Sequence, residues 1–422
     1  MSQPLWTPSP ERIEQTNVTS LINKINADWD VSLTNSEHLH QFSVTEMEKF
    51  WRSLIEYAEL NGETWTGPEL VDRNKLPGAK WFPEARFNYA ENILKRRDDA
   101  DAFVFWGENK VKRRMSFKTL YDQVSSISQA LKGMGVGPGD KVAGYLPNLP
   151  ETIIATLAAA SLGAAWSSCS PDFGAQGVLD RFSQIKPKVV FCANGYHYNG
   201  KTHDSLGKVE EIVIQLPSVE HVVVIEYLDG APDLSGLKNA QHWGDVIANH
   251  APNEIEFAQL PFDQPLYIMF SSGTTGAPKC IIHSAGGSLL KHASEHLLHC
   301  NMKRDDRIFF FSTCGWMMWN WLVSSLAWGA TVLLYDGSPF YPSPNILFDY
   351  VDAENMTLFG TSAKFIDALS KNGVRPMDTH DLGSVKIMCS TGSTLAPEGF
   401  DYVYGAIKKN FHLVSFTGGT DI

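Results

Sequence analysis

A run of hydroxyl and glycine residues ending in a lysine is the feature of this 422-residue sequence best suited to chemistry. Glycines let a backbone turn until several N–H groups point at one anion, and hydroxyls add neutral donors around it. The terminal lysine supplies a fixed positive charge, and an apolar run directly before the segment argues against the alternative of a flexible surface turn. The spacing is not that of a Walker loop. We therefore predict a polyphosphate-binding loop made of Ser271, Ser272, Gly273, Thr274, Thr275, Gly276, Ala277, Pro278 and Lys279.

Three other segments could contribute to such a site. Residues 390–394 and 416–421 each combine hydroxyl residues with glycine after an apolar run, and residues 315–321 contain three tryptophans and two methionines. Each segment also has an ordinary interpretation from its residues alone. These are a helix N-cap, a turn at the end of a strand and a helix packed in the core. The phosphate loop is what makes a functional interpretation of all three attractive.

The loop closely resembles the phosphate-binding signature of adenylate-forming enzymes, the superfamily of acyl-CoA synthetases, luciferases and peptide-synthetase adenylation domains. Cys280 stands where that family usually has glycine. The resemblance runs from about residue 80 to the last residue and implies the large N-terminal domain of the adenylate-forming fold. It implies that ATP is bound by Ser271, Ser272, Gly273, Thr274, Thr275, Gly276, Lys279, Gly392, Ser393, Thr394, Gly419, Thr420 and Asp421.

The resemblance also implies roles for individual residues. Lys279 and Thr420 would be catalytic, acting on the phosphates, and Asp421 would hold Mg²⁺ in place of the usual glutamate, since this metal requires hard oxygen ligands. Lys201 would contact a phosphate of CoA, with an ordinary solvated lysine as the alternative. The acyl pocket would be lined by Trp316, Met317, Met318 and Gly418.

One branch of the family, which activates acetoacetate, is the most similar. Related acetyl-CoA synthetases carry at the position of Gly418 a tryptophan that closes the acyl pocket, so a glycine implies room for a longer acid. The implied reaction converts acetoacetate, ATP and CoA through an acyl-adenylate into acetoacetyl-CoA, AMP and pyrophosphate. A ligase for another short acid and a non-catalytic nucleotide-binding remnant are the alternatives. The similarity to the branch lies in residues 88–92, 167–174, 198–201, 315–321, 335–339 and 418–422.

Alternating apolar runs and helical patterns predict the elements that position these residues. We expect helices at 151–162 and 175–185 between strands at 141–146, 164–166 and 188–192, and an amphipathic helix around residues 50–55. Strand–helix–strand alternation indicates a parallel sheet with helices on both faces. A second such sheet is expected from the apolar runs at 266–270, 307–311, 331–335, 357–360, 385–389 and 412–416.

The expected architecture is therefore α/β, with two doubly wound sheets sandwiched by helices and a small β-subdomain. Residues 1–80 would form an N-terminal cap, residues 81–260 a first α/β subdomain, and residues 261–422 a second one with the ATP and acyl site. Family members continue past the position of Ile422 with a hinge and a small C-terminal domain that carries a catalytic lysine. We expect that domain to be absent and this chain alone to be a poor ligase.

Bulk composition excludes several classes of protein. A hydrophobic fraction of 43% indicates a packed globular core, and a net charge of −12 argues against a nucleic-acid surface. The longest apolar stretch, residues 152–166, is too short and too polar to insert into a membrane. Six scattered cysteines without a C-x-x-C pair are expected to be buried thiols in a reducing compartment, so the protein is expected to be cytoplasmic. The expected partners are the small-molecule substrates, and the oligomeric state is not indicated.

Overall fold

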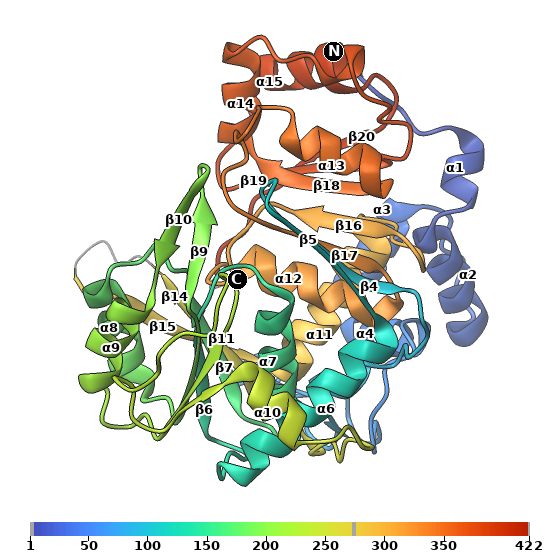
Figure 1. Ribbon diagram of the computed structural model, residues 1–422. Helices are drawn as coiled ribbons and strands as arrows, with labels where there is room; N and C mark the ends of the chain where they lie inside the picture. The colour runs from blue at the N-terminus through green and yellow to red at the C-terminus, as the bar shows by residue number, and fades with distance from the viewer. Residues whose placement is uncertain (1–3, 272–275, 421–422) are drawn as a thin grey trace.

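Strands and helices alternate along most of the chain and form two seven-stranded sheets. The structure is a computed structural model, and it describes residues 4–271 and 276–420. Figure 1 shows the two sheets as separate layers, with α7 (Pro150–Ser161) and α12 (Met317–Ser324) between them. The predicted α/β class is confirmed.

The first sheet contains all three strands predicted in residues 141–192. Its neighbouring strands are parallel except for the pair at one edge, which is an antiparallel hairpin. In order across the sheet, the strands are β12 (Ala240–His242), β11 (His221–Ile225), β8 (Val189–Ala193), β6 (Lys141–Tyr145), β7 (Ala165–Cys169), β14 (Pro265–Ser271) and β15 (Lys279–Ser284).

The second sheet is also parallel except at one edge, where β4 and β5 are antiparallel. Its strands in order are β20 (His412–Ser415), β19 (Ile387–Thr391), β18 (Leu358–Ser362), β16 (Arg307–Phe310), β17 (Thr331–Asp336), β4 (Asp101–Gly107) and β5 (Val111–Ser116). Small β structure is present as three two-stranded sheets, which pair β1 (Leu70–Val71) with β2 (Lys80–Trp81), β3 (Arg86–Phe87) with β13 (Leu260–Pro261), and β9 (Gly195–Tyr198) with β10 (Lys201–Asp204).

Two strand placements differ from the prediction. The run at 266–270 was expected in the second sheet, but β14 lies in the first, beside β7. Conversely, β4 pairs with β17 in the second sheet although it lies among the residues expected to build the first. Apolar runs identify strands but do not say which partner each strand takes, because pairing is decided by long-range packing. The division of the chain at residues 80 and 260 stays a prediction.

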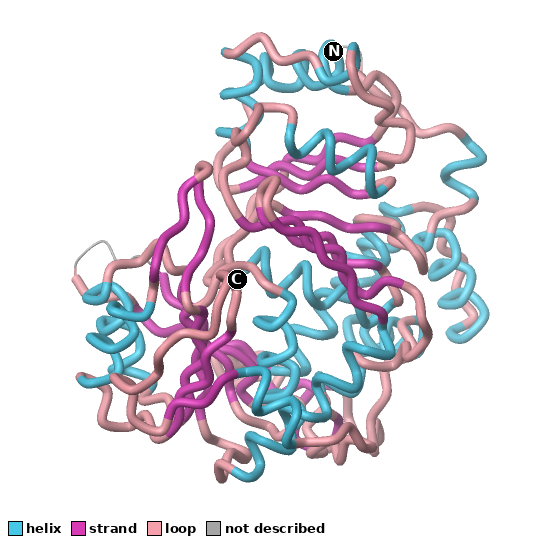
Figure 2. Tube along the Cα trace, in the orientation of Figure 1, coloured by secondary structure: helices cyan, strands magenta, loops and turns pink. Residues whose placement is uncertain are grey.

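Helices cover both sheets, and several begin at residues that cap them. Pro150 occupies the first turn of α7, where its missing N–H costs nothing, and every residue of α7 is buried. The amphipathic pattern around residues 50–55 is the helix α4 (Met47–Tyr57). Figure 2 shows helices on both sides of the strands. The remaining α-helices are α1 (Pro10–Glu14), α2 (Asn17–Trp29), α3 (Ser36–Thr45), α5 (Tyr89–Ile93), α6 (Phe117–Gly133), α8 (Ala175–Ile185), α9 (Leu206–Ile214), α10 (Trp243–Asn249), α11 (Ala285–Ala293), α13 (Ile346–Glu354), α14 (Ala363–Lys371) and α15 (Pro397–Tyr402).

Candidate functional site

The predicted phosphate loop connects the two strands of the β14–β15 hairpin. Ser271, the last residue of β14, lies opposite Lys279, the first residue of β15. Lys279 is exposed, and Gly276 has a φ of +132°, which an L side chain rarely adopts. The loop residues Ser272, Gly273, Thr274 and Thr275 lie outside the described residues. The hairpin therefore holds the lysine and one hydroxyl side by side at the base of the loop.

The base of the loop is attached to α8. The Gln184 side chain donates to the Pro278 carbonyl at 2.9 Å and accepts a hydrogen bond from the Cys280 thiol at 3.4 Å. Both contacts are made by one amide, so a single side chain positions the turn before Lys279. Sequence reasoning missed Gln184, since its helical pattern offers no sign of a contact almost a hundred residues away.

The segments 391–394 and 416–420 lie side by side at the end of the second sheet. The Thr391 hydroxyl donates to the Phe416 carbonyl at 2.9 Å, and the Phe416 N–H donates to the Ser390 carbonyl at 3.1 Å. Gly392 has a φ of +83°, and Ser393 and Thr394 beyond it are exposed. Two of the predicted ATP-binding segments are thereby brought together.

The chain then crosses from the second sheet to the first. The main chain of Thr420 lies beside the His283 imidazole of β15, four residues after Lys279. Burial lowers the pKa of His283, and the contact with Thr420 opposes that change. Gly419 and Thr420 are half-buried. His283 is a neighbour of the site that sequence reasoning missed, although an isolated histidine in an apolar strand is a visible signal.

Asp421, the predicted Mg²⁺ ligand, lies outside the described residues. Among residues 4–271 and 276–420, no three His, Cys, Asp or Glu side chains cluster as a metal site would require. Magnesium usually relies on one or two carboxylates together with substrate phosphates, so such a cluster is not needed for it. The assignment of Asp421 stays a prediction.

The predicted acyl-pocket residues lie at the start of α12. Trp316 is the N-cap residue and is 60% exposed, whereas Met317 and Met318 are half-buried and contact the main core. The Asn320 amide contacts the Met269 sulfur of β14 at 3.6 Å and the Trp316 carbonyl at 3.3 Å. This amide places the beginning of α12 next to the strand that leads into the phosphate loop.

Gly418 lies in open space. A Cβ atom added to it would meet no described atom within 4 Å, and the residue is exposed. A Cβ atom could therefore be added at residue 418 without displacing its described surroundings. The structure leaves the assignment of Gly418 to the acyl pocket as a prediction.

Lys201 lies in a different place. It is the exposed first residue of β10, in a hairpin whose turn is held by the buried carboxylate of Glu108. That carboxylate accepts hydrogen bonds from the N–H groups of Asn199 at 2.6 Å, Gly200 at 2.9 Å and Ser338 at 3.0 Å. No described contact joins Lys201 to the β14–β15 turn, and its role stays a prediction.

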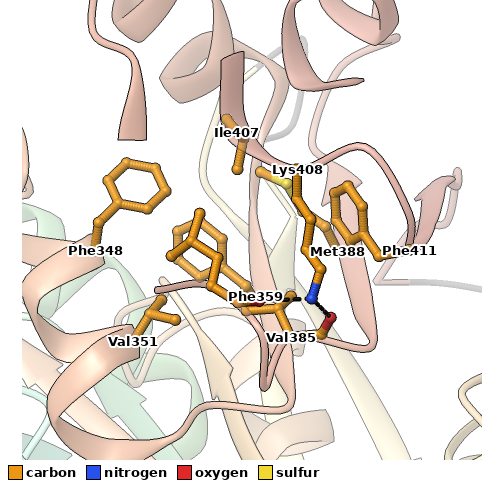
Figure 3. Close-up of a pocket in the computed structure, with 9 residues that line it drawn as sticks. Phe348, Val351, Phe359, Val385, Met388, Ile407, Lys408 and Phe411 are labelled. Carbon is orange, nitrogen blue, oxygen red and sulfur yellow. Dashed lines mark hydrogen bonds between the residues drawn. The ribbon is translucent and has the colours of Figure 1, made fainter. Parts of the chain in front are cut away.

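The cavity drawn in Figure 3 is not a candidate site. It measures about 10 Å³, roughly the room of one water molecule, and is lined mainly by apolar side chains such as Phe348 and Phe359. The Lys408 ammonium at its edge donates to the carbonyls of Leu382, Gly383 and Val385 at 2.6, 3.0 and 2.8 Å. Lys408 thus has a structural role in closing the turn before β19.

Two cysteines depart from the expectation. Cys169, Cys192, Cys314 and Cys389 are buried free thiols as predicted, but Cys280 is exposed and Cys300 is half-buried. Cys280 is exposed because it follows Lys279 at the beginning of β15, which is the edge strand of the first sheet. Within the described part of the chain, no helix has the length and apolar character that crossing a bilayer would require.

The arrangement of these segments suits a nucleotide and a small organic molecule. A lysine and a serine lie side by side on the hairpin, and segment 416–420 reaches the hairpin at His283. Segment 391–394 adjoins segment 416–420, and the aromatic start of α12 lies next to β14. Glycines allow close approach of a flat ring or a phosphate, and the apolar side chains exclude water. The residues are supplied by both sheets.

Comparisons with known proteins agree with this arrangement. A family model described as "AMP-binding enzyme" matches residues 90–411. The chain is 48% identical over 421 residues to an acetoacetyl-coenzyme A synthetase of Rhizobium meliloti (strain 1021), covering 100% of this chain and 64% of the relative. It is 44% identical over 432 residues to an acetoacetyl-CoA synthetase of Danio rerio, with the same coverage.

A solved structure has the same fold. The acetoacetyl-CoA synthetase from Streptomyces lividans superimposes with a TM-score of 0.93 and 39% sequence identity, over 100% of this chain and 65% of that one. The chain thus spans about 64% of the length of the curated relatives that it matches.

Proposed function

The chain belongs to the family of AMP-binding enzymes, and from this premise we propose that it binds ATP at the β14–β15 turn and takes part in ligating acetoacetate to CoA. The observation that carries the proposal is the convergence on one hairpin of Lys279, the segment 416–420 and the start of α12. Relatives that match the whole chain are named for this ligation.

The proposed reaction has two steps. The carboxylate of the acid attacks the α-phosphorus of ATP, which forms an acyl-adenylate and expels pyrophosphate. The CoA thiol then attacks the acyl carbon, and AMP leaves. Neither step needs a covalent bond to the enzyme, so alignment of the reactants and stabilisation of phosphate charge would provide most of the rate.

Individual residues take roles that follow from their positions. Lys279 and the Ser271 hydroxyl would hold the outer phosphates, because they face each other at the base of the loop. Thr420 would act near the α-phosphate, and a magnesium ion on Asp421 would neutralise phosphate charge when bound. Trp316 and Gly418 would bound the acyl group, and Lys201 would meet a phosphate of CoA. A cytoplasmic location fits these substrates.

Two measurements test the proposal. Calorimetric titration with ATP should show one site, and Lys279→Gln should weaken it about tenfold, because one charge-assisted hydrogen bond is lost. Lys238→Gln, at an exposed position on the surface, is the matched control. Acid-dependent exchange of pyrophosphate into ATP should then be fastest with acetoacetate in a panel that includes acetate, propionate and butyrate.

The outcomes separate the alternatives. Absence of ATP binding would refute the site itself. Faster exchange with butyrate than with acetoacetate would contradict the proposed acid substrate and still support ligase activity. ATP binding without exchange for any acid would favour a non-catalytic nucleotide-binding protein.

A further inference from the structure

A second cavity lies at the N-terminal ends of strands β16, β18 and β19 of the second sheet. It measures about 440 Å³ and is lined by the first residues of β16, β18 and β19, by α1 with its cap residue Ser9, and by the loop 300–303. The predicted adenylate site lies beyond the other end of β19, after Thr391. This cleft is therefore separate from the site described above, and its volume is in the range of small-molecule pockets.

The cleft is lined in part by apolar residues. Ile308, Leu358 and Ile387 are among them, but these side chains are only 0%, 3% and 4% exposed, so they add little open apolar surface. They are fixed by neighbouring strands of one sheet, so this part of the lining is rigid.

The sides of the cleft are cationic. Arg12, Lys303 and Lys386 line it, together with the carboxylates of Glu11 and Asp306. The Asp306 carboxylate forms an ion pair with the Lys386 ammonium, with 2.7 Å between Oδ1 and Nζ. Glu11 lies on the exposed surface of α1. Among the described residues, Arg12 and the exposed Lys303 therefore line the cleft without a carboxylate in an ion pair with either of them, in a chain whose net charge is −12.

The other contacts of these two cations are to neutral groups. In the part of the chain that the structure describes, Lys303 donates to the Gln15 carbonyl at 3.1 Å and to the Asn17 side-chain oxygen at 2.5 Å, and neither it nor Arg12 forms an ion pair. Arg12 donates to the Lys386 carbonyl at 3.3 Å, and its guanidinium lies over the Trp6 ring. These contacts hold both charges in place without neutralising them.

The surroundings show that the positive charges act on one another. Partial burial lowers the pKa of Lys303 against an opposing effect of Asp306, and the nearby charge of Lys386 lowers it further. Burial lowers the pKa of His412, and the charge of Arg12 adds to this. A bound anion would offset the repulsion between Lys303 and Lys386.

We propose that this cleft is a binding site for an organic phosphate, with the phosphate between Arg12 and Lys303 and the organic body in the remaining volume of the cleft. A phosphate ester carries nearly two negative charges at neutral pH, which matches the two unpaired cations. An arginine and a lysine are the usual donors to such a group.

Cys300 lines the cleft and reports on it. Iodoacetate is anionic and iodoacetamide is neutral. The alkylation rate with iodoacetate divided by the rate with iodoacetamide, at one cysteine, therefore rises with a more positive local potential, and differences in thiol reactivity cancel. We expect this ratio, measured by peptide mass spectrometry, to be higher at Cys300 than at the exposed Cys280. Lys303→Gln and Arg12→Gln should each lower the ratio at Cys300 by about threefold, and Lys303→Arg should preserve it.

Occupancy is tested with phenyl phosphate as the probe and phenol as its neutral counterpart. Millimolar phenyl phosphate should slow the reaction of Cys300 with iodoacetamide and leave Cys280 unaffected, phenol should protect neither, and Lys303→Gln should abolish the protection. The variants Lys118→Gln and Lys238→Gln, at exposed positions elsewhere, control for a general change in charge.

The iodoacetamide rate at Cys300 without probe shows whether each variant keeps its local fold, and Lys303→Gln retains a donor for Asn17. Unchanged rate ratios in both neutral variants would overturn the proposal. So would failure of phenyl phosphate to protect Cys300, or equal protection by phenol, which would mean an apolar site only.

Discussion

Asp336 ends β17 with a carboxylate oxygen that is inaccessible to solvent, and the Tyr227 hydroxyl lies beside this carboxyl group. Burial raises the pKa of Asp336 to about 7, and the negative charges of Asp172 and Glu108 raise it further, against a hydrogen bond from the main chain of Asn148. Sequence reasoning noted the segment 335–339 as a similarity but gave its carboxylate no role. A buried acid of this kind makes stability depend on pH near neutrality.

The pH dependence can be isolated with Asp336→Asn. The folded-state pKa is raised, so the stability that Asp336 contributes is present below its unfolded pKa of about 4 and is lost as pH rises through about 7. Asparagine does not ionise, so the variant should gain about 2 kcal/mol relative to the parent between pH 5 and pH 7. Urea unfolding at each pH measures this. Asp99→Asn, at an exposed position, should show no such trend.

Gly418 allows a second test at the scale of one residue. A side chain can start there because the Cβ position is open, and we expect a tryptophan to shorten the proposed acyl pocket. We expect Gly418→Trp to increase the ratio of pyrophosphate exchange with acetate to that with acetoacetate by about 10- to 100-fold. Gly418→Ala should leave the preference near its starting value. An unchanged preference in the tryptophan variant would remove Gly418 from the pocket.

At the scale of elements, the β9–β10 hairpin is positioned by one carboxylate. Glu108 is fully buried and accepts main-chain hydrogen bonds from the hairpin turn at Asn199 and Gly200 and from Ser338 after β17. The turn also packs closely on the Tyr341 ring, which leaves no room for a Cβ at Gly200. The first and second sheets are thereby connected at the end where their parallel strands finish.

Glu108→Gln should loosen this connection. One accepting oxygen becomes an NH₂ group that faces main-chain donors, so we expect a loss of about 2 kcal/mol in the free energy of unfolding. Hydrogen exchange should increase at Asn199, Gly200 and Ser338 and remain unchanged in β14. Glu63→Gln, at an exposed position, is the control, and equal exchange in both variants would refute the connection.

At the scale of the whole molecule, each of the two sheets contains strands from both halves of the sequence. The edge pair β4–β5 joins the second sheet through β17, and the hairpin β14–β15 joins the first through β7. One hydrophobic core contains residues of both sheets, among them Phe103, Val142, Leu266 and Ile308. The proposed ATP site therefore depends on both sheets being formed.

A fragment of residues 1–260 should not fold by itself. Its β4 would lack β17, and its β7 would expose an edge that β14 covers in the intact chain. We expect weak protection from proteolysis and no cooperative thermal unfolding by circular dichroism, whereas the 422-residue chain should show both. A cooperatively unfolding fragment would support the predicted division at residue 260 as a true domain boundary.

Local pattern was enough to determine the elements and the kind of chemistry. The helix at 175–185 and the strands β6 and β8 were predicted within one or two residues, and 164–166 marked only the beginning of β7. The strands β11, β12 and β15 of the same sheet were not predicted. The phosphate loop is likewise a local feature, since its glycines, hydroxyls and lysine are consecutive. Each follows from interactions between residues that are near in the sequence.

Only the tertiary structure decided which strands are partners and which distant side chains meet. It placed β14 beside β7, brought Thr420 to His283, and set Gln184 under the loop before Lys279. It also opened a cationic cleft between α1 and the starts of β16, β18 and β19, from residues that carry no motif. Such contacts depend on how whole elements pack, and the periodicity of a single segment holds no information about its partner.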